Sequence, residues 1–133
     1  MVSILEVQAA IIVLLKAHPG LVAVVGTEIR EDEWSATNFK YPCVRVSMGD
    51  VVQNGPCLES VSFSVSSNTV DASSFLCLQL ADIVVMYLED KSLVGIGFKS
   101  AADIRYTRRG APTKGANQRW QATTQFKVNV STP

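Results

Sequence analysis

The sequence predicts an α+β fold, in which an antiparallel sheet of four or five strands, whose edge can be mixed, carries two helices packed on one face. Three patterns predict it. Residues 119–130 alternate between apolar and polar side chains, as a strand does when one of its faces is buried. Residues 43–48 and 61–66 alternate in the same way. Residues 4–17 and 71–89 are rich in apolar side chains, which recur at helical spacing in the second segment.

Composition predicts a single domain that spans residues 1–133. The chain is 47% hydrophobic and 18% charged, so it can bury a core and is not disordered. Its longest apolar run, Ala9–Leu15, is shorter than the roughly 18 residues that a membrane span needs, and no membrane contact is expected. The three cysteines, Cys43, Cys57 and Cys77, are predicted to be small buried hydrophobes in a reducing cytoplasm.

The first helix has clear boundaries. Ser3 and Glu6 have the spacing of a capping box, in which each side chain satisfies a backbone N–H at the start of a helix. The helix is predicted to run to about Ala17 and to end at His18-Pro19, because a proline disfavours helical geometry at the residue before it. His18 is interpreted as a capping or surface residue. A short apolar turn or single helical turn follows over 20–26.

Strands and turns alternate along the middle of the chain. A brief strand is predicted around Ile29, and Cys43–Met48 begins a hairpin that turns at Gln53–Pro56. In this strand Val44, Val46 and Met48 face the core, and Arg45 and Ser47 face the opposite side.

The C-terminal half is predicted to hold the second helix and the last two strands. Asp71 suits the N-cap of a helix that reaches about Glu89. Tyr106 and Trp120 fall on the core side of the two strands. The connection between those strands holds Gly110, Pro112 and Gly115, and it is expected to project from the body.

Charge is divided unevenly along the chain, although the net charge is zero. Residues 1–103 hold all twelve acidic side chains, and residues 104–133 hold six basic ones and no acid. We hypothesise that the basic segment is an interaction loop, made of Arg105, Arg108, Arg109, Lys114 and Arg119. A complementary acidic patch is proposed at Glu28, Glu31, Asp32 and Glu33. Such poles can pair within one molecule or between copies.

Signals for catalysis are weak. The chain has one histidine and none of the common nucleophile, zinc or phosphate-loop motifs. We therefore expect no enzyme activity, no catalytic residues, no cofactor and no metal site. A nucleic-acid-binding module stays open as an alternative. It is weakened because Tyr106 and Trp120 fall in core register and so offer no stacking platform.

The order of these pieces resembles the phage tail-terminator and tail-completion family, of the kind called minor tail protein U-like. The resemblance rests on the apolar N-terminal helix, the segment PGLVAVVGTEIRED over 19–32 and the strand YPCVRVSM over 41–48. The serine-rich strand at 61–66, the central helix and the final strand pair complete it. It covers nearly the whole chain.

The resemblance implies a structural virion protein of the tail or neck, assembled in the host cytoplasm. Members of that family cap the tail tube as a ring, commonly a hexamer, which ends tube growth and forms the docking face for the head–tail connector. The implied partners are therefore other copies of the chain, the tail tube protein and the connector or neck protein, with passing contact to DNA in the lumen. Another neck or head-completion role stays open as an alternative. The resemblance implies no catalytic residues.

Overall fold

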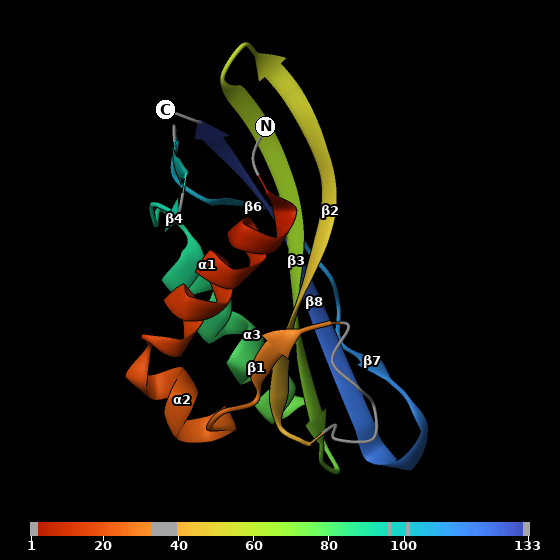
Figure 1. Cartoon of the computed structure of the whole chain (residues 1–133). Helices are drawn as coiled ribbons and strands as arrows, with labels where there is room; N and C mark the ends of the chain where they lie inside the picture. Colours follow the sequence, from red (N-terminus) through yellow and green to blue (C-terminus); the bar gives the residue numbers. More distant parts are fainter. Residues whose placement is uncertain (1–2, 33–39, 96, 101, 132–133) are drawn as a thin grey trace.

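The computed structural model describes residues 3–32, 40–95, 97–100 and 102–131, which form three helices on one side of a curled sheet (Figure 1). The helices are α1 (Ile4–Lys16), α2 (Pro19–Val25) and α3 (Phe75–Leu88). The strands are β1 (Ile29–Glu31), β2 (Cys43–Gly55), β3 (Leu58–Val70), β4 (Val94–Gly95), β5 (Phe98–Ser100), β6 (Arg105–Arg109), β7 (Thr113–Lys114) and β8 (Arg119–Ser131), with a short 3₁₀ helix at Ala116–Gln118.

The sheet is mostly antiparallel and is built around β8. Its order is β1-β2-β3-β8-β5-β4, and β6 and β7 also pair with β8. Because β3 occupies one side of β8 along its whole length, strands β5, β6 and β7 lie on the other side. β1 is parallel to β2, so the sheet has the mixed edge that the sequence allowed.

The α+β class is confirmed, but two details of the prediction are wrong. The described residues form eight strands, not four or five, because β4, β5 and β7 are only two or three residues long and show no periodicity. They form three helices, not two, because the apolar turn after Pro19 closes into α2.

The two N-terminal helices are set by their caps. The Ser3 side chain accepts a hydrogen bond from the N–H of Glu6 at the start of α1. Pro19 ends α1 and occupies the first turn of α2, where its missing N–H has no consequence. His18 caps α2, because its Nδ1 accepts a hydrogen bond of 3.0 Å from the N–H of Leu21. The prediction of a capping His18 is confirmed.

β2 and β3 form a long antiparallel hairpin that extends beyond the rest of the body (Figure 1). The register shifts between Met48 and Val51 and again between Gln53 and Gly55. The hairpin is therefore confirmed, but its strands are longer than predicted and β2 continues to Gly55.

Helix α3 begins later than predicted. Its first residue is Phe75 and its N-cap is Ser74. The Asp71 carboxylate instead accepts a hydrogen bond of 2.6 Å from the N–H of Ala72, in the turn before the helix. An Asp side chain can stabilise such a turn as well as a helix start, so the sequence alone did not separate the two positions.

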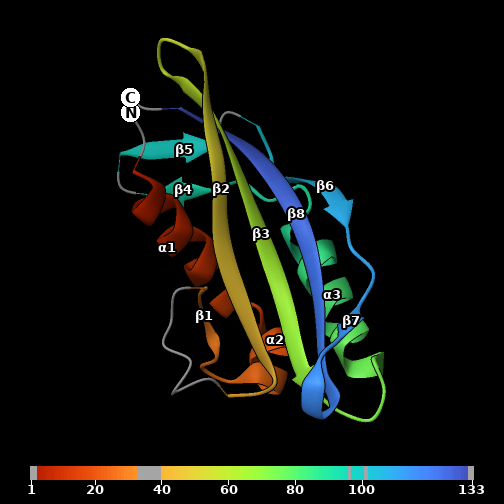
Figure 2. The same ribbon diagram turned by 90° about the vertical axis from the view of Figure 1, so that its right-hand side faces the viewer.

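The core lies between the helices and one face of the sheet. Every second residue of β8 from Ala122 to Val130 is buried there. At its centre the rings of Phe63 and Phe126 stack across β3 and β8, with centroids 5.2 Å apart. The opposite face of the sheet, which we call the open face, is covered by none of the three described helices (Figure 2).

Two side chains depart from their predicted environment. Tyr106 falls opposite Phe126 as expected, yet it is 47% exposed, because β6 lies at the sheet edge and pairs only with β8. Arg45 was placed on the polar face, yet it is 1% exposed. It lies in the middle of the sheet, in register with Arg30 and Ser66.

In the described part of the chain, no single helix is both long and apolar enough to cross a membrane. α1 and α2 would have enough length and apolar character only if taken together, and the chain bends by 92° between them.

We expect Phe126→Ala to lower the free energy of unfolding by ~3–5 kcal/mol. Phe126 is only 1% exposed, so the substitution removes one ring of the stacked pair and leaves a buried cavity. Urea denaturation followed by circular dichroism measures this change. Met86→Ala is the matched control: Met86 is 82% exposed, and its loss should change the free energy by less than ~0.5 kcal/mol. Equal effects of the two substitutions would contradict the packing described.

We expect one cysteine thiol of the native protein to react rapidly with maleimide. Cys43 and Cys77 are buried as predicted, but Cys57 is exposed, so the prediction is wrong for that residue. Burial raises the pKa of Cys43 to about 11 and raises the pKa of Cys77 as well, so both thiols stay protonated and unreactive at pH 8. Maleimide labelling followed by mass spectrometry should give one adduct in buffer and three in guanidinium. Rapid formation of two or more maleimide adducts per folded chain would contradict the burial of Cys43 and Cys77.

Candidate interaction surfaces

The five basic residues of the hypothesised interaction loop lie on three strands at one side of the sheet. Arg105, Arg108 and Arg109 belong to β6, Lys114 to β7 and Arg119 to the start of β8. All five are exposed. The structure therefore places them along one edge, but it gives them different surroundings.

Two of these arginines form ion pairs within the chain. Arg105 contacts Glu89 at 3.2 Å and Asp90 at 2.6 Å, and Arg109 contacts Asp82. These acids lie on α3 or directly after it. Hydrogen bonding to Glu89, together with the charge of Asp90, raises the pKa of Arg105. The positive charges of Arg105 and Arg109 are therefore partly compensated within the chain.

The other three make no ion pair with the described residues. Lys114 lies over the ring of Trp120, with Nζ 5.7 Å from the centroid, and the Arg119 guanidinium lies 5.5 Å from the centroid of Tyr41. Arg108 is in register with Gln125 of β8. Gln125 faces away from the helices, so Arg108 belongs to the open face of the sheet.

The connection after β6 does not project from the body as predicted. The N–H of Gly110 donates to the carbonyl of Thr123 at 2.9 Å, and β7 pairs with Gln121 and Trp120 of β8. The Thr113 hydroxyl also donates to the carbonyl of Gln121. Glycine and proline indicate a turn, but they do not show that the turn folds back onto a long neighbouring strand.

This connection and β8 enclose a shallow groove on the open face. Its volume is about 440 Å³. We call it the β6–β7 groove, and it is lined by Arg108, Gly110, Ala111, Thr113, Gln121, Thr123 and Gln125. Its described lining holds one cation, two threonine hydroxyls and two glutamine amides and no carboxylate, so it offers a small anionic group both a charge and hydrogen bonds.

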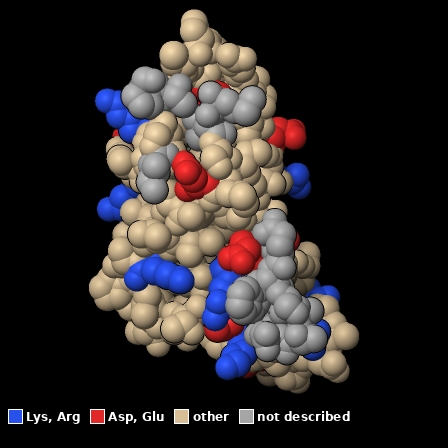
Figure 3. Space-filling view, viewed as in Figure 1, with Lys and Arg blue, Asp and Glu red and all other residues tan. Residues whose placement is uncertain are grey.

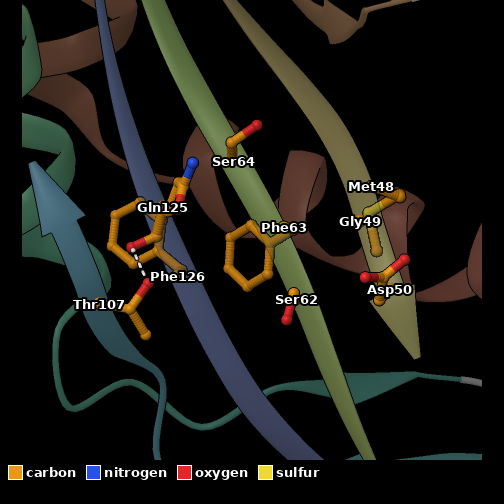
Figure 4. Close-up of a pocket in the computed structure, with 9 residues that line it drawn as sticks. All are labelled: Met48, Gly49, Asp50, Ser62, Phe63, Ser64, Thr107, Gln125 and Phe126. Carbon is orange, nitrogen blue, oxygen red and sulfur yellow. Dashed lines mark hydrogen bonds between the residues drawn. The ribbon is translucent and has the colours of Figure 1, made fainter. Parts of the chain in front are cut away.

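A second depression of about 350 Å³ adjoins the groove through Gln125 (Figure 4). Ser62 and Ser64 of β3 line it, with Asp50 at the register shift of β2. Thr107 closes its other side and donates a hydrogen bond to the carbonyl of Gln125. The Asp50 carboxylate makes this depression less suitable for an anion.

The acidic patch is smaller than the sequence suggested. The Glu28 side chain is 12% exposed and forms an ion pair of 3.5 Å with Arg30. Glu31 ends β1, and Asp32 follows it in an exposed turn. Glu33 lies outside the described residues. Figure 3 shows acidic and basic side chains together beside β1, and a largely uncharged surface over α1 and α2.

The acidic and basic residues lie at opposite edges of the sheet. Glu31 pairs with Val46, Val46 with Val65, Val65 with Thr124, and Thr124 with Arg109. One transverse row therefore runs from the acidic edge to the basic edge. Four strand spacings separate its ends, or about 19 Å. Sequence reasoning found both sets of charges but had no signal for this row, which depends on long-range register.

The described residues contain no cluster of three or more potential metal-binding side chains. The His18 ring is engaged as a helix cap and lies edge-on to Tyr87, with centroids 4.6 Å apart.

Comparison with solved structures identifies a similar fold. The chain matches one from the virion of a native gene transfer agent (GTA) particle with a TM-score of 0.77 and 21% sequence identity, over 95% of each chain. At this identity the match shows a shared fold. No protein-family profile matches the sequence, and no curated protein matches it.

We expect Glu89→Ala to loosen β6. The Glu89 carboxylate accepts hydrogen bonds from Arg105 and from the N–H of Tyr106, the latter at 2.9 Å. Hydrogen exchange at the Tyr106 amide should accelerate roughly fivefold, the factor for ~1 kcal/mol. Asp103→Ala is the control, because Asp103 accepts a hydrogen bond from Ser92 and none from β6. Unchanged exchange in Glu89→Ala would show that this carboxylate does not hold the strand.

Proposed function

We propose that this protein is a structural component of a phage-like virion. The observation that carries the proposal is the fold, which is shared with a GTA virion chain over 95% of both molecules. The sequence resemblance to tail-terminator proteins supports the same role independently. The proposal assigns the chain an assembly function and no reaction.

Within the virion, we propose that copies of the chain form a ring that caps the tail tube. A closed ring needs two different surfaces on each copy that fit one another. Glu31 and Asp32 at one sheet edge and Arg108 at the other form no ion pair with the described residues, and they supply surfaces of opposite charge. In the family that the sequence resembles, such rings commonly hold six copies.

The same observation supports a second role. The GTA comparison names a whole particle, so another neck or head-completion position accounts for the shared fold equally well. The proposed partners differ between the two roles: the tail tube and the connector for a terminator, and neighbouring neck proteins for the alternative.

We expect the purified protein to form rings that cap tubes. Light scattering after size-exclusion chromatography should give a multiple of the 14.4 kDa monomer mass. Negative-stain images should show ring-shaped particles at one end of purified tail tubes, and tubes without the protein are the control. Rings that never bind a tube would favour the alternative neck role. A monomer at every concentration that also never decorates a tube would contradict the proposal.

A further inference from the structure

We propose that the β6–β7 groove receives the Glu31–Asp32 turn of a second copy of this chain. This inference rests on the proposed ring and names the contact that would hold it together. It commits the groove to a protein carboxylate, whereas a nucleic-acid phosphate is the competing anion.

The charges of the groove carry the first step. Arg105 and Arg109 are compensated by acids on or directly after α3, but Arg108 forms no ion pair with the described residues. Arg108 lines the groove together with neutral threonine and glutamine residues, and none of the described lining residues is acidic. A guanidinium in such surroundings binds a carboxylate well, because both its hydrogen bonds and its charge are available.

The charges of the opposite edge carry the second step. Glu28 is nearly buried and pairs with Arg30. Glu31 and Asp32 form no ion pair with the described residues, and Asp32 is exposed. The N–H of Asp32 donates to the carbonyl of Val46 at 2.9 Å, so the backbone at Asp32 is held against β2. A residue held in this way loses little conformational freedom when it binds.

The register of the sheet carries the third step. Arg108 is in register with Gln125, one residue from the row that joins Glu31 to Thr124. In a ring whose axis follows the strands, complementary patches must lie at the same height, because otherwise the copies would climb into a helix instead of closing. The acidic turn and the groove meet this condition.

The same features disfavour DNA as the occupant of the groove. A phosphate backbone is bound through many cations, and its affinity depends on their number. Among the described residues that line this groove, Arg108 is the one cation, and the adjoining depression adds Asp50. The arrangement suits one short acidic turn better than a long polyanion.

A charge-exchange experiment tests the proposal. Arg108→Glu alone and the double variant Glu31→Lys, Asp32→Lys alone should each lose rings, seen as a shift to monomers in light scattering. An equimolar mixture should regain rings of alternating subunits, because the acidic groove of one variant then faces the basic turn of the other. This recovery cannot be explained by misfolding of either chain. Lys127→Glu and Asp50→Lys are the controls: both residues are exposed and lie outside the groove, and both variants should keep their rings.

The outcomes separate this inference from the proposed function. If Arg108→Glu forms rings normally, or if the mixture fails to recover them, the contact is overturned while ring formation by the unmodified protein still stands. If the unmodified protein never forms rings, the proposed function fails first. A labelled 30-base-pair duplex titrated by fluorescence anisotropy completes the test. Duplex binding that is lost in Arg108→Glu while rings persist would assign the groove to DNA and overturn the proposal.

Discussion

The pairing of β3 with β8 is the constraint on which the rest of the structure depends. All thirteen residues of β3 are in register with β8, without a shift, from Leu58 opposite Ser131 to Val70 opposite Arg119. The alternation of both strands therefore coincides, so apolar residues gather beneath the helices and polar ones on the open face. The stacked Phe63 and Phe126 rings fix this register at its centre, because a slip of one residue between the two strands would place the two rings on opposite faces of the sheet.

Acidic residues on or directly after helix α3 pair with two of the three arginines of β6 and leave the third without an ion pair among the described residues. Asp82 of α3 pairs with Arg109, and Glu89 and Asp90 directly after α3 pair with Arg105, whereas Arg108 belongs to the open face. After the register shift between Tyr106 and Arg108, neighbouring residues of β6 face opposite sides: Arg109 pairs with Asp82, whereas Arg108 makes no ion pair with the described residues. The six bases after residue 103 are therefore not one surface, and a partner that approaches from the open face meets fewer charges than the sequence suggests.

Elements with strong periodicity could be predicted from the sequence. Helices α1 and α3 and the hairpin follow from local patterns, as do the strand at 119–130 and the caps at Ser3 and His18. Strands β4, β5 and β7 could not be predicted, because two or three residues carry no period and form a strand only beside β8. For the candidate site, the charged residues could be identified. Their ion pairs with Asp82 and Glu89 could not, because those contacts span 27 and 16 positions and depend on tertiary packing.

The fold-back of β7 onto β8 has a mechanical consequence. Hydrogen bonds at Gly110 and Thr113 tie the connection to the long strand, so the separation of Arg108 from Arg119 is set by the rise of β8 and not by loop motion. Six residues of an antiparallel strand span about 20 Å. A partner that contacts both Arg108 and Arg119 must therefore span this distance along the sheet. Because the distance is fixed, the basic edge can select partners by the spacing of their acidic groups.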